Sequence, residues 1–88
     1  MRFVITDEFL IICQGIISER RSLLEWKEHE SSDSFQSENF CGGFDADEEA
    51  FCFSFYRDSE EYWFQVDLKE VEEIISGKLK TLDLVEPD

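Results

Sequence analysis

The side chains that most often carry catalysis are scarce in this sequence. His29 is the single histidine of the chain, and any Ser-His-Asp or Cys-His arrangement would need it as its base. It lies in a polar stretch, so we expect a surface histidine. Cys41 precedes Gly42-Gly43, but no basic residue is near in sequence, and the many carboxylates should raise the pKa of this thiol. We therefore predict that the chain is not an enzyme.

Carboxylates are abundant, and one run of them imitates a calcium-binding loop. The alternating acids of residues 45–49 (Asp-Ala-Asp-Glu-Glu) resemble the opening of such a loop. The pattern then fails, because the sixth position is Ala50 instead of glycine and the twelfth is Tyr56 instead of glutamate. We expect no functional metal site, although adventitious binding of Ca²⁺ or Mg²⁺ stays open. A glycine-rich phosphate loop is also missing, and we expect no cofactor.

Acidic charge is concentrated in the middle of the chain. The 88 residues have the length of one domain, and 42% of them are hydrophobic, enough for a folded core. The formal net charge is −14, and residues 28–73 hold 15 acidic residues against the two bases Arg57 and Lys69, a net charge of −13. Such a surface repels nucleic-acid phosphate and anionic lipid. We therefore expect a basic protein as partner, and neither nucleic acid nor a membrane.

The cysteines and the apolar runs indicate the compartment. Cys13, Cys41 and Cys52 make an odd count without Cys-x-x-Cys spacing, which argues against a disulfide framework or a zinc site. We expect all three to be reduced and mostly buried. The longest apolar run, residues 9–13, is far shorter than the ~18 residues of a membrane span, and the acidic pair Asp7-Glu8 does not suit a signal peptide. These features predict a cytoplasmic protein.

Two segments have the spacing of amphipathic helices. Over residues 7–28, apolar side chains recur at the three- and four-residue intervals of one stripe, and Thr6 or the next residue can cap the start. Gly15 weakens the pattern and an arginine interrupts the stripe, so we expect a break near Ser18. A hairpin over residues 9–17 is the alternative.

The second helix is predicted between a cap and a glycine. Asp67 can cap it, and Glu70, three residues on, completes a capping box. Gly77 ends it. The remaining residues 81–88 are expected to be a tail.

Between the helices the hydrophobic period changes to two, as in strands. Phenylalanine occupies every second position of residues 51–56, and residues 62–66 alternate in the same way. Residues 39–44 predict a third strand, in which Gly42-Gly43 indicates a bulge or a close backbone approach. The serine-rich residues 29–38 are expected to form a loop. The sequence thus predicts a small α+β domain of order α-β-β-β-α, a three-stranded antiparallel meander with two helices on one face.

The apolar faces of the two best strands predict how they pair. A four-residue loop over residues 58–61 keeps both apolar sets on the side that the helices cover. The opposite side is then left to solvent. This register gives four pairs: Phe55 with Phe64, Phe53 with Val66, Tyr56 with Trp63, and Ser54 with Gln65.

The solvent side of this sheet is our candidate site. Tyr56 and Trp63 belong to the residue types enriched at interface hot spots, so we expect them to bind a partner, with acids around them to steer a basic one. The alternative is an ordinary sheet-face pair beneath a solvated acidic coat. The predicted rim is Asp58, Glu60 and Glu61 at one end, and Asp45, Asp47, Glu48 and Glu49 at the other.

In size, acidity and aromatic strands beside the turn Tyr56-Arg57-Asp58, the chain resembles the small acidic immunity proteins of bacterial nuclease toxins. The resemblance covers residues 39–67 and is one of kind. It implies an inhibitor, made in the cytoplasm beside its toxin, that binds as a monomer and fills a basic active-site cleft without catalysis or cofactor.

Two other readings stay open. One is a phage-type nucleic-acid mimic, which would use the same electrostatics on a host nuclease or DNA-binding complex. The other is an adaptor or oligomer subunit, including a homodimer, that uses an apolar Tyr56/Trp63 face. Salt separates this last reading from the first two, because it weakens steered acidic recognition and leaves an apolar interface intact.

Overall fold

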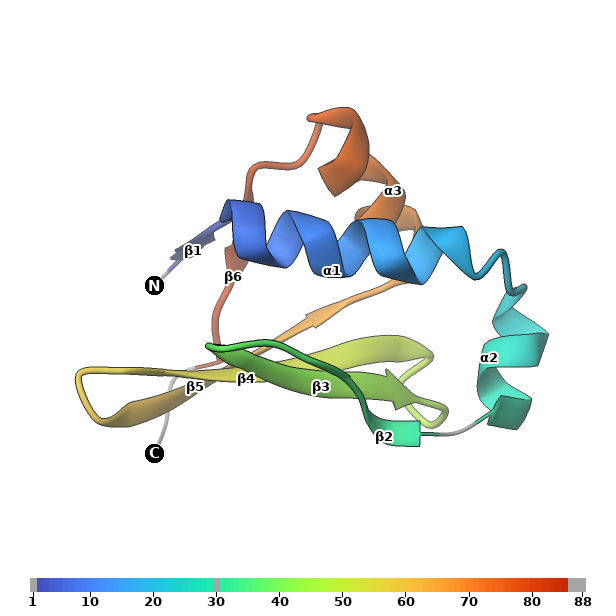
Figure 1. Cartoon of the computed structure of the whole chain (residues 1–88), viewed down its shortest axis with the longest axis horizontal. Helices are drawn as coiled ribbons and strands as arrows, with labels where there is room; N and C mark the ends of the chain where they lie inside the picture. The colour runs from blue at the N-terminus through green and yellow to red at the C-terminus, as the bar shows by residue number, and fades with distance from the viewer. Residues whose placement is uncertain (1, 30, 86–88) are drawn as a thin grey trace.

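The computed structural model describes residues 2–29 and 31–85, and for residues 29 and 31–34 it describes the backbone alone. Within these ranges the chain forms three helices and six strands (Figure 1). In chain order they are β1 (Arg2–Val4), α1 (Asp7–Ser18), α2 (Leu23–His29), β2 (Ser31–Gln36), β3 (Phe40–Asp45), β4 (Ala50–Arg57), β5 (Glu60–Val66), α3 (Leu68–Ser76) and β6 (Thr81–Asp83).

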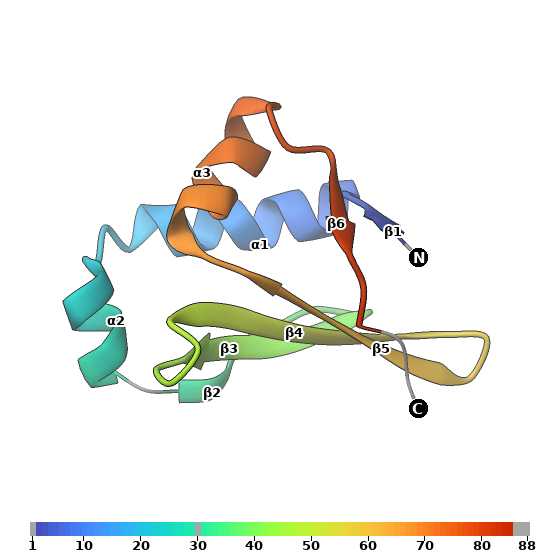
Figure 2. The same ribbon diagram turned by 180° about the vertical axis from the view of Figure 1, so that it is seen from behind.

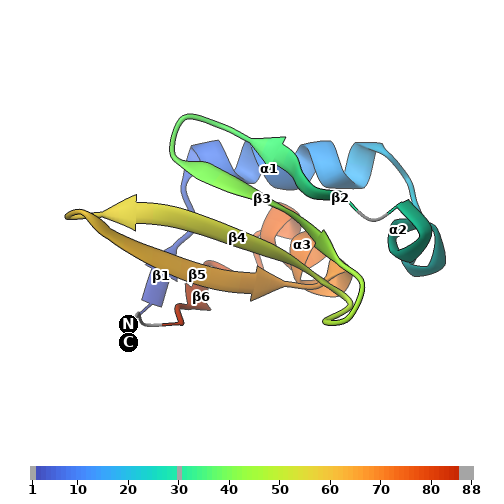
Figure 3. The ribbon, with the colours of Figure 1, turned by 90° about the horizontal axis from the view of Figure 1, so that it is seen from below.

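The helices lie on one side of the larger sheet. This sheet is antiparallel with the order β2-β3-β4-β5, and a second, two-stranded sheet joins β1 to β6. Figures 1 and 2 show α1 and α3 above the larger sheet, with α2 closing one end. Seen from below, β3, β4 and β5 lie in front of the helices (Figure 3). The α+β class is confirmed, and no helix in the described ranges is long and apolar enough to cross a membrane.

Aromatic rings fill the space between the helices and the sheet. Eight of the nine phenylalanines are buried. Phe3 from β1 stacks on Phe64 of β5 with ring centroids 5.0 Å apart, and Phe9 of α1 meets Phe53 of β4 edge-on at 5.2 Å. Strand alternation therefore sends one side of each strand into the core, as the sequence predicts, and leaves the other side outside it.

The first helix is real and ends where expected. The Thr6 hydroxyl accepts a hydrogen bond from the Phe9 backbone N–H at 3.3 Å, so Thr6 is the cap, and the hairpin alternative over residues 9–17 is wrong. The break near Ser18 is confirmed. Its cause lies in the backbone, because Arg20 adopts a left-handed conformation with φ of 54°.

The last helix follows its prediction closely. The Asp67 side chain accepts from the Glu70 N–H at 2.8 Å, and the Asp67 N–H donates to the Glu70 carboxylate at 3.1 Å, which completes the capping box. Gly77 ends α3 with a left-handed φ of 83°.

The predicted order α-β-β-β-α is incomplete. The expected loop over residues 29–38 contains the strand β2, so the sheet has four strands instead of three. The expected tail contains β6, which pairs with β1; only residues 86–88 of that tail lie outside the described residues. β6 forms through a partner at the other end of the chain, whereas β2 forms a local hairpin with β3. In β2, pairing with the neighbouring strand overrides a serine-rich composition that favours loops.

The close backbone approach predicted at Gly42-Gly43 is confirmed. A Cβ on Gly42 would come within 2.6 Å of the Phe53 ring and closer still to the Cys52 carbonyl oxygen. The pairing of β3 with β4 is uninterrupted, so β3 has no bulge towards β4. The irregularity lies on the other side, between Ser31 and Phe35 of β2.

Candidate partner-binding face

We call the side of β3, β4 and β5 that faces away from α1 and α3 the outer face (Figure 3). Strand alternation places nine residues on it: Cys41, Gly43 and Asp45 from β3, Cys52, Ser54 and Tyr56 from β4, and Glu61, Trp63 and Gln65 from β5. Tyr56 and Trp63 are 70% and 51% exposed. Their predicted position on the solvent side is therefore confirmed.

The predicted register of β4 and β5 is wrong by two residues. Tyr56 pairs with Glu61, and Ser54 pairs with Trp63. On the core side the predicted pairs are likewise replaced by three others: Phe51 with Val66, Phe53 with Phe64, and Phe55 with Tyr62. The even shift keeps every side chain on its predicted face.

The turn explains this shift. Asp58 and Ser59 both have positive φ, 53° and 66°, as in the two-residue type I′ turn that matches the twist of paired strands. The loop therefore has two residues instead of the predicted four. Tyr56 and Trp63 become diagonal neighbours across β4 and β5 instead of a direct pair.

A hollow of about 450 Å³ lies between the strands of the outer face. Small residues line it where β3 and β4 run side by side: Cys41, Gly43, Cys52 and Ser54. Trp63 of β5 lines it on one side, and Asp45 and Asp47 line it where β3 enters the turn. The hollow thus joins the exposed tryptophan to one acidic turn.

The acids of the β3–β4 turn have two different surroundings. The Asp45 carboxylate accepts the Asp47 N–H at 2.9 Å and the Glu48 N–H at 3.3 Å, so the turn itself fixes its orientation. Glu49 instead lies 3.5 Å from the ammonium group of Lys27 on α2. Asp45 and Asp47 therefore contribute negative charge to the outer face. The charge of Glu49 is instead partly neutralised by Lys27 of α2.

The acids of the β4–β5 turn are also divided. Glu61 hydrogen-bonds the Tyr56 hydroxyl on the outer face and raises the pKa of Tyr56, chiefly through its charge. Glu60 accepts the Tyr62 hydroxyl at 3.1 Å on the core side, where the Arg57 guanidinium lies 5.6 Å from the centre of the Phe55 ring. Turns 45–49 and 58–59 lie at opposite ends of β4, so acids are present at both predicted ends. The predicted place of Glu60 in the rim of the outer face is wrong, because strand alternation and the Tyr62 hydroxyl put it on the core side.

The two charged residues that the strands place on the outer face, Asp45 and Glu61, are both acidic. Among the described residues of β3, β4 and β5, no outward position holds Lys or Arg. Burial raises the pKa of the Cys52 thiol, and the nearby charges of Asp45 and Glu48 raise it further, while a hydrogen bond with Gln65 opposes them. The negative potential of the turn therefore reaches the floor of the hollow.

Two predictions about chemistry can be compared with the fold. Cys13 is buried, and burial raises its pKa to about 12, while Cys41 and Cys52 are half-buried on the outer face. Among the described residues, no group of three or more His, Cys, Asp or Glu side chains is placed to hold a metal ion. The side chain of His29 lies outside the described part of the chain.

Sequence reasoning missed one residue of the outer face. Val85 is 61% exposed, and its N–H donates to the Trp63 carbonyl at 2.8 Å, which makes a bridge along the free edge of β5. It was expected in a tail. The pattern could not reveal it, because a single bridging residue has no periodicity.

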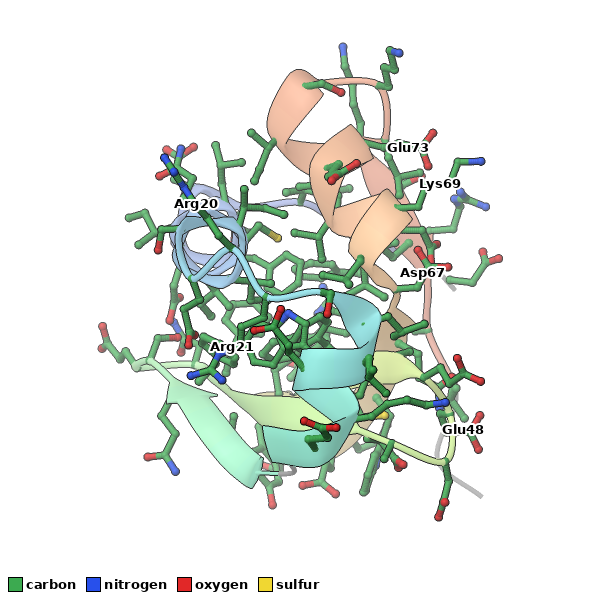
Figure 4. All side chains as sticks on the ribbon, turned by 90° about the vertical axis from the view of Figure 1, so that its right-hand side faces the viewer. Arg20, Arg21, Glu48, Asp67, Lys69 and Glu73 are labelled. Carbon is green, nitrogen blue, oxygen red and sulfur yellow. The ribbon has the colours of Figure 1, made fainter. Side chains whose placement is uncertain are left out.

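Within the described part of the chain, the helical end of the molecule has two hollows, each lined by both acidic and basic residues. One of about 610 Å³ lies between the β3–β4 turn, Leu23 of α2 and the start of α3, and another of about 430 Å³ lies between the three helices. Figure 4 shows Arg20 and Arg21 on one side, with Lys69 among the acids of α3 on the other. This end lacks the single sign of charge that would select a basic partner.

The chain was also compared with known proteins. No protein-family model, curated protein or solved structure matches it.

Proposed function

We propose that this protein is a non-catalytic acidic binding protein that holds a basic protein partner against its outer face. In its specific form, it is a cytoplasmic immunity protein that neutralises a bacterial nuclease toxin. One observation carries the proposal: Tyr56 and Trp63 are exposed on a helix-free sheet face with acidic turns at both ends.

The aromatic pair supplies the energy in this proposal. Burying a large aromatic side chain against a partner removes much apolar area from water at small entropic cost, and such residues dominate interface hot spots. Trp63 already has Val85 beside it, so the apolar strip continues past the edge of β5. A partner that covers this strip gains contact area without disturbing the core.

In this proposal the acidic residues select a basic partner and speed its association. Enzymes that act on nucleic acid have basic clefts, and carboxylates can occupy the positions where phosphates would sit. Charges at the ends of the outer face would accelerate association with such a cleft and reject acidic proteins. Filling a cleft requires complementary surface alone, so the proposed role needs neither a catalytic group nor a cofactor.

The test is capture followed by an activity assay. Immobilised protein is exposed to lysate of the source cell and to any toxin-like neighbouring gene product, then eluted along a salt gradient. We expect one stoichiometric basic protein, released as salt rises, whose nuclease activity falls to zero at a one-to-one ratio. The variant Glu72→Gln changes one charge on an exposed residue of α3 and should behave as the wild type.

Other results would remove the proposal. A basic partner without nuclease activity would exclude the toxin inhibitor, and a host DNA-binding complex would favour the nucleic-acid mimic. The strip of Tyr56, Trp63 and Val85 also supports a second candidate, an adaptor or homodimer joined through the outer face. Self-association that persists at high salt would select that candidate.

A further inference from the structure

The hollow on the outer face exists because its floor has little side-chain volume. Gly43 has no side chain, and Cys52 and Ser54 on β4 are short. Trp63, the largest residue type, lines the same hollow from β5. The small side chains at these positions therefore leave a hollow of about 450 Å³, which a side chain from outside can enter.

The two ends of the hollow have different chemistry. At the β5 end, Trp63 offers a half-exposed aromatic ring. At the turn end, Asp45 and Asp47 offer carboxylates, and the turn hydrogen bonds hold Asp45 in place. A ligand that lies along the hollow must therefore be apolar in one part and positively charged in another.

Arginine fits this order of groups better than other side chains. Its methylene stem packs on apolar surface while its head stays polar. Its guanidinium is planar and weakly hydrated, and it can donate to two carboxylate oxygens at once, whereas the compact ammonium of lysine is strongly hydrated. We propose that the hollow is a subsite for one arginine side chain of the partner protein, with the stem against Trp63 and the guanidinium at Asp45 and Asp47.

The source of the arginine rests on the proposed function, but the chemistry of the hollow can be tested on the protein alone. A blocked Gly-Arg-Gly peptide is titrated while the backbone amides and the Trp63 indole N–H are followed by NMR. We expect saturable shifts at Gly43, Cys52 and the Trp63 indole. The uncharged citrulline analogue should bind at least about tenfold more weakly, since it loses the charge-assisted bonds.

Two variants make the test specific. Cys52→Leu fills the floor of the hollow without changing its charge. Asp47→Asn removes one carboxylate from an exposed turn residue, whose substitution should not disturb the fold. Both variants should bind the arginine peptide about tenfold more weakly than the wild type, while Glu72→Gln on α3 should bind it with unchanged affinity. Equal binding of arginine and citrulline, or shifts confined to other surfaces, would overturn the subsite.

The same variants separate the two proposals. If a basic partner is captured and needs Trp63, but binds the Cys52→Leu and Asp47→Asn variants as tightly as the wild type, the proposed function stands and the arginine subsite fails. If no basic partner exists, yet the arginine peptide alone shifts the hollow in a charge-dependent way, the subsite stands and the proposed function fails.

Discussion

Trp26 and Trp63 occupy opposite environments, and the difference assigns them different roles. Trp26 is 2% exposed and lies among the rings of Phe35, Phe44 and Phe51. Trp63 is 51% exposed on the outer face. One tryptophan therefore stabilises the fold, and the other is available to a partner.

We expect truncation of the two tryptophans to lower the free energy of unfolding by unequal amounts. Trp26→Ala should lower the free energy of unfolding by about 3–5 kcal/mol, because it empties a buried aromatic site. Trp63→Ala should lower it by only about 1 kcal/mol, since much of its ring already meets solvent. Urea unfolding of both variants measures this difference. Equal losses would mean that Trp63 is a core residue and not an interface residue.

Glu8 predicts a local pH dependence of stability. Its carboxylate accepts hydrogen bonds from the Asn39 side chain at 2.8 Å, from the Ser37 hydroxyl and from the Asn39 N–H at 2.9 Å. These bonds, the Asn39 side chain foremost, hold the pKa of Glu8 below its usual value of 4.5. A lowered pKa means that the stabilisation is complete above the usual value and is lost as the pH falls through the folded value.

The variant Glu8→Gln isolates this contribution. The wild type should be more stable than Glu8→Gln at neutral pH, and the difference in free energy of unfolding should shrink as the pH falls below about 4.5. Urea titrations from about pH 7 to about pH 3 measure it, and Glu72→Gln serves as the control for a simple change of charge. A difference that stays constant with pH would show that the bonds to residues 37 and 39 do not hold this carboxylate.

At the scale of elements, short-range signals determine most of the fold. Capping residues predict both ends of α3, and period-two alternation predicts β4, β5 and the face that each residue occupies. The strands β1, β2 and β6 could not be predicted in this way. Arg2 and Asp83 pair although they lie 81 positions apart in the sequence, and β2 is serine-rich. The strands β1 and β6 depend on partners brought close by the rest of the fold, and β2 depends on its pairing with the adjacent β3.

In the candidate site, too, the features that depend on strand periodicity could be predicted from the sequence, and those that depend on turn geometry could not. The solvent-facing positions of Tyr56 and Trp63 follow from alternation alone, and the acidic ends follow from the acid-rich turns at either end of β4. The diagonal placement of Tyr56 and Trp63 depends on a two-residue turn at Asp58-Ser59. The sequence signal for that turn is weak, because type I′ turns favour glycine at the second position and this chain has serine there.

The turn gives a direct prediction. Replacing Ser59 with glycine should stabilise the protein by about 0.5–1 kcal/mol, because serine is strained at a φ of 66° and glycine is not. Thermal unfolding measures the change. A loss of stability would argue for a wider loop without this strain, and hence for the direct pairing of Tyr56 with Trp63.

Two glycines form a matched pair that tests the backbone of the helices. A Cβ added to Gly15 or to Gly77 meets no atom within 4 Å, so neither substitution is opposed by packing. Gly15 is helical inside α1, and Gly15→Ala should stabilise by about 0.5–1 kcal/mol. Gly77 has a left-handed φ, and Gly77→Ala should destabilise by about 1 kcal/mol. Shifts of the same sign in thermal unfolding would contradict this account.

At the scale of the whole molecule, the fold separates stability from recognition. The helices and the small β1–β6 sheet bury one side of the larger sheet in aromatic core, and the other side is left without a helix. The sheet and its turns, residues 31–66, hold nine acidic residues against the single base Arg57, a net charge of −8 out of −14. A single layer of strands thus supplies both a rigid core face and an acidic aromatic outer face.

The affinity of the captured basic partner for wild-type protein and for Trp63→Ala, measured by surface plasmon resonance with Glu72→Gln as control, tests the central claim most directly. We predict that Trp63→Ala weakens binding by about 2 kcal/mol or more, mainly through faster dissociation. Neutralising Glu61 should mainly slow association, and rising salt should do the same. An affinity of Trp63→Ala equal to that of the wild type would contradict the claim that the outer face is the interface.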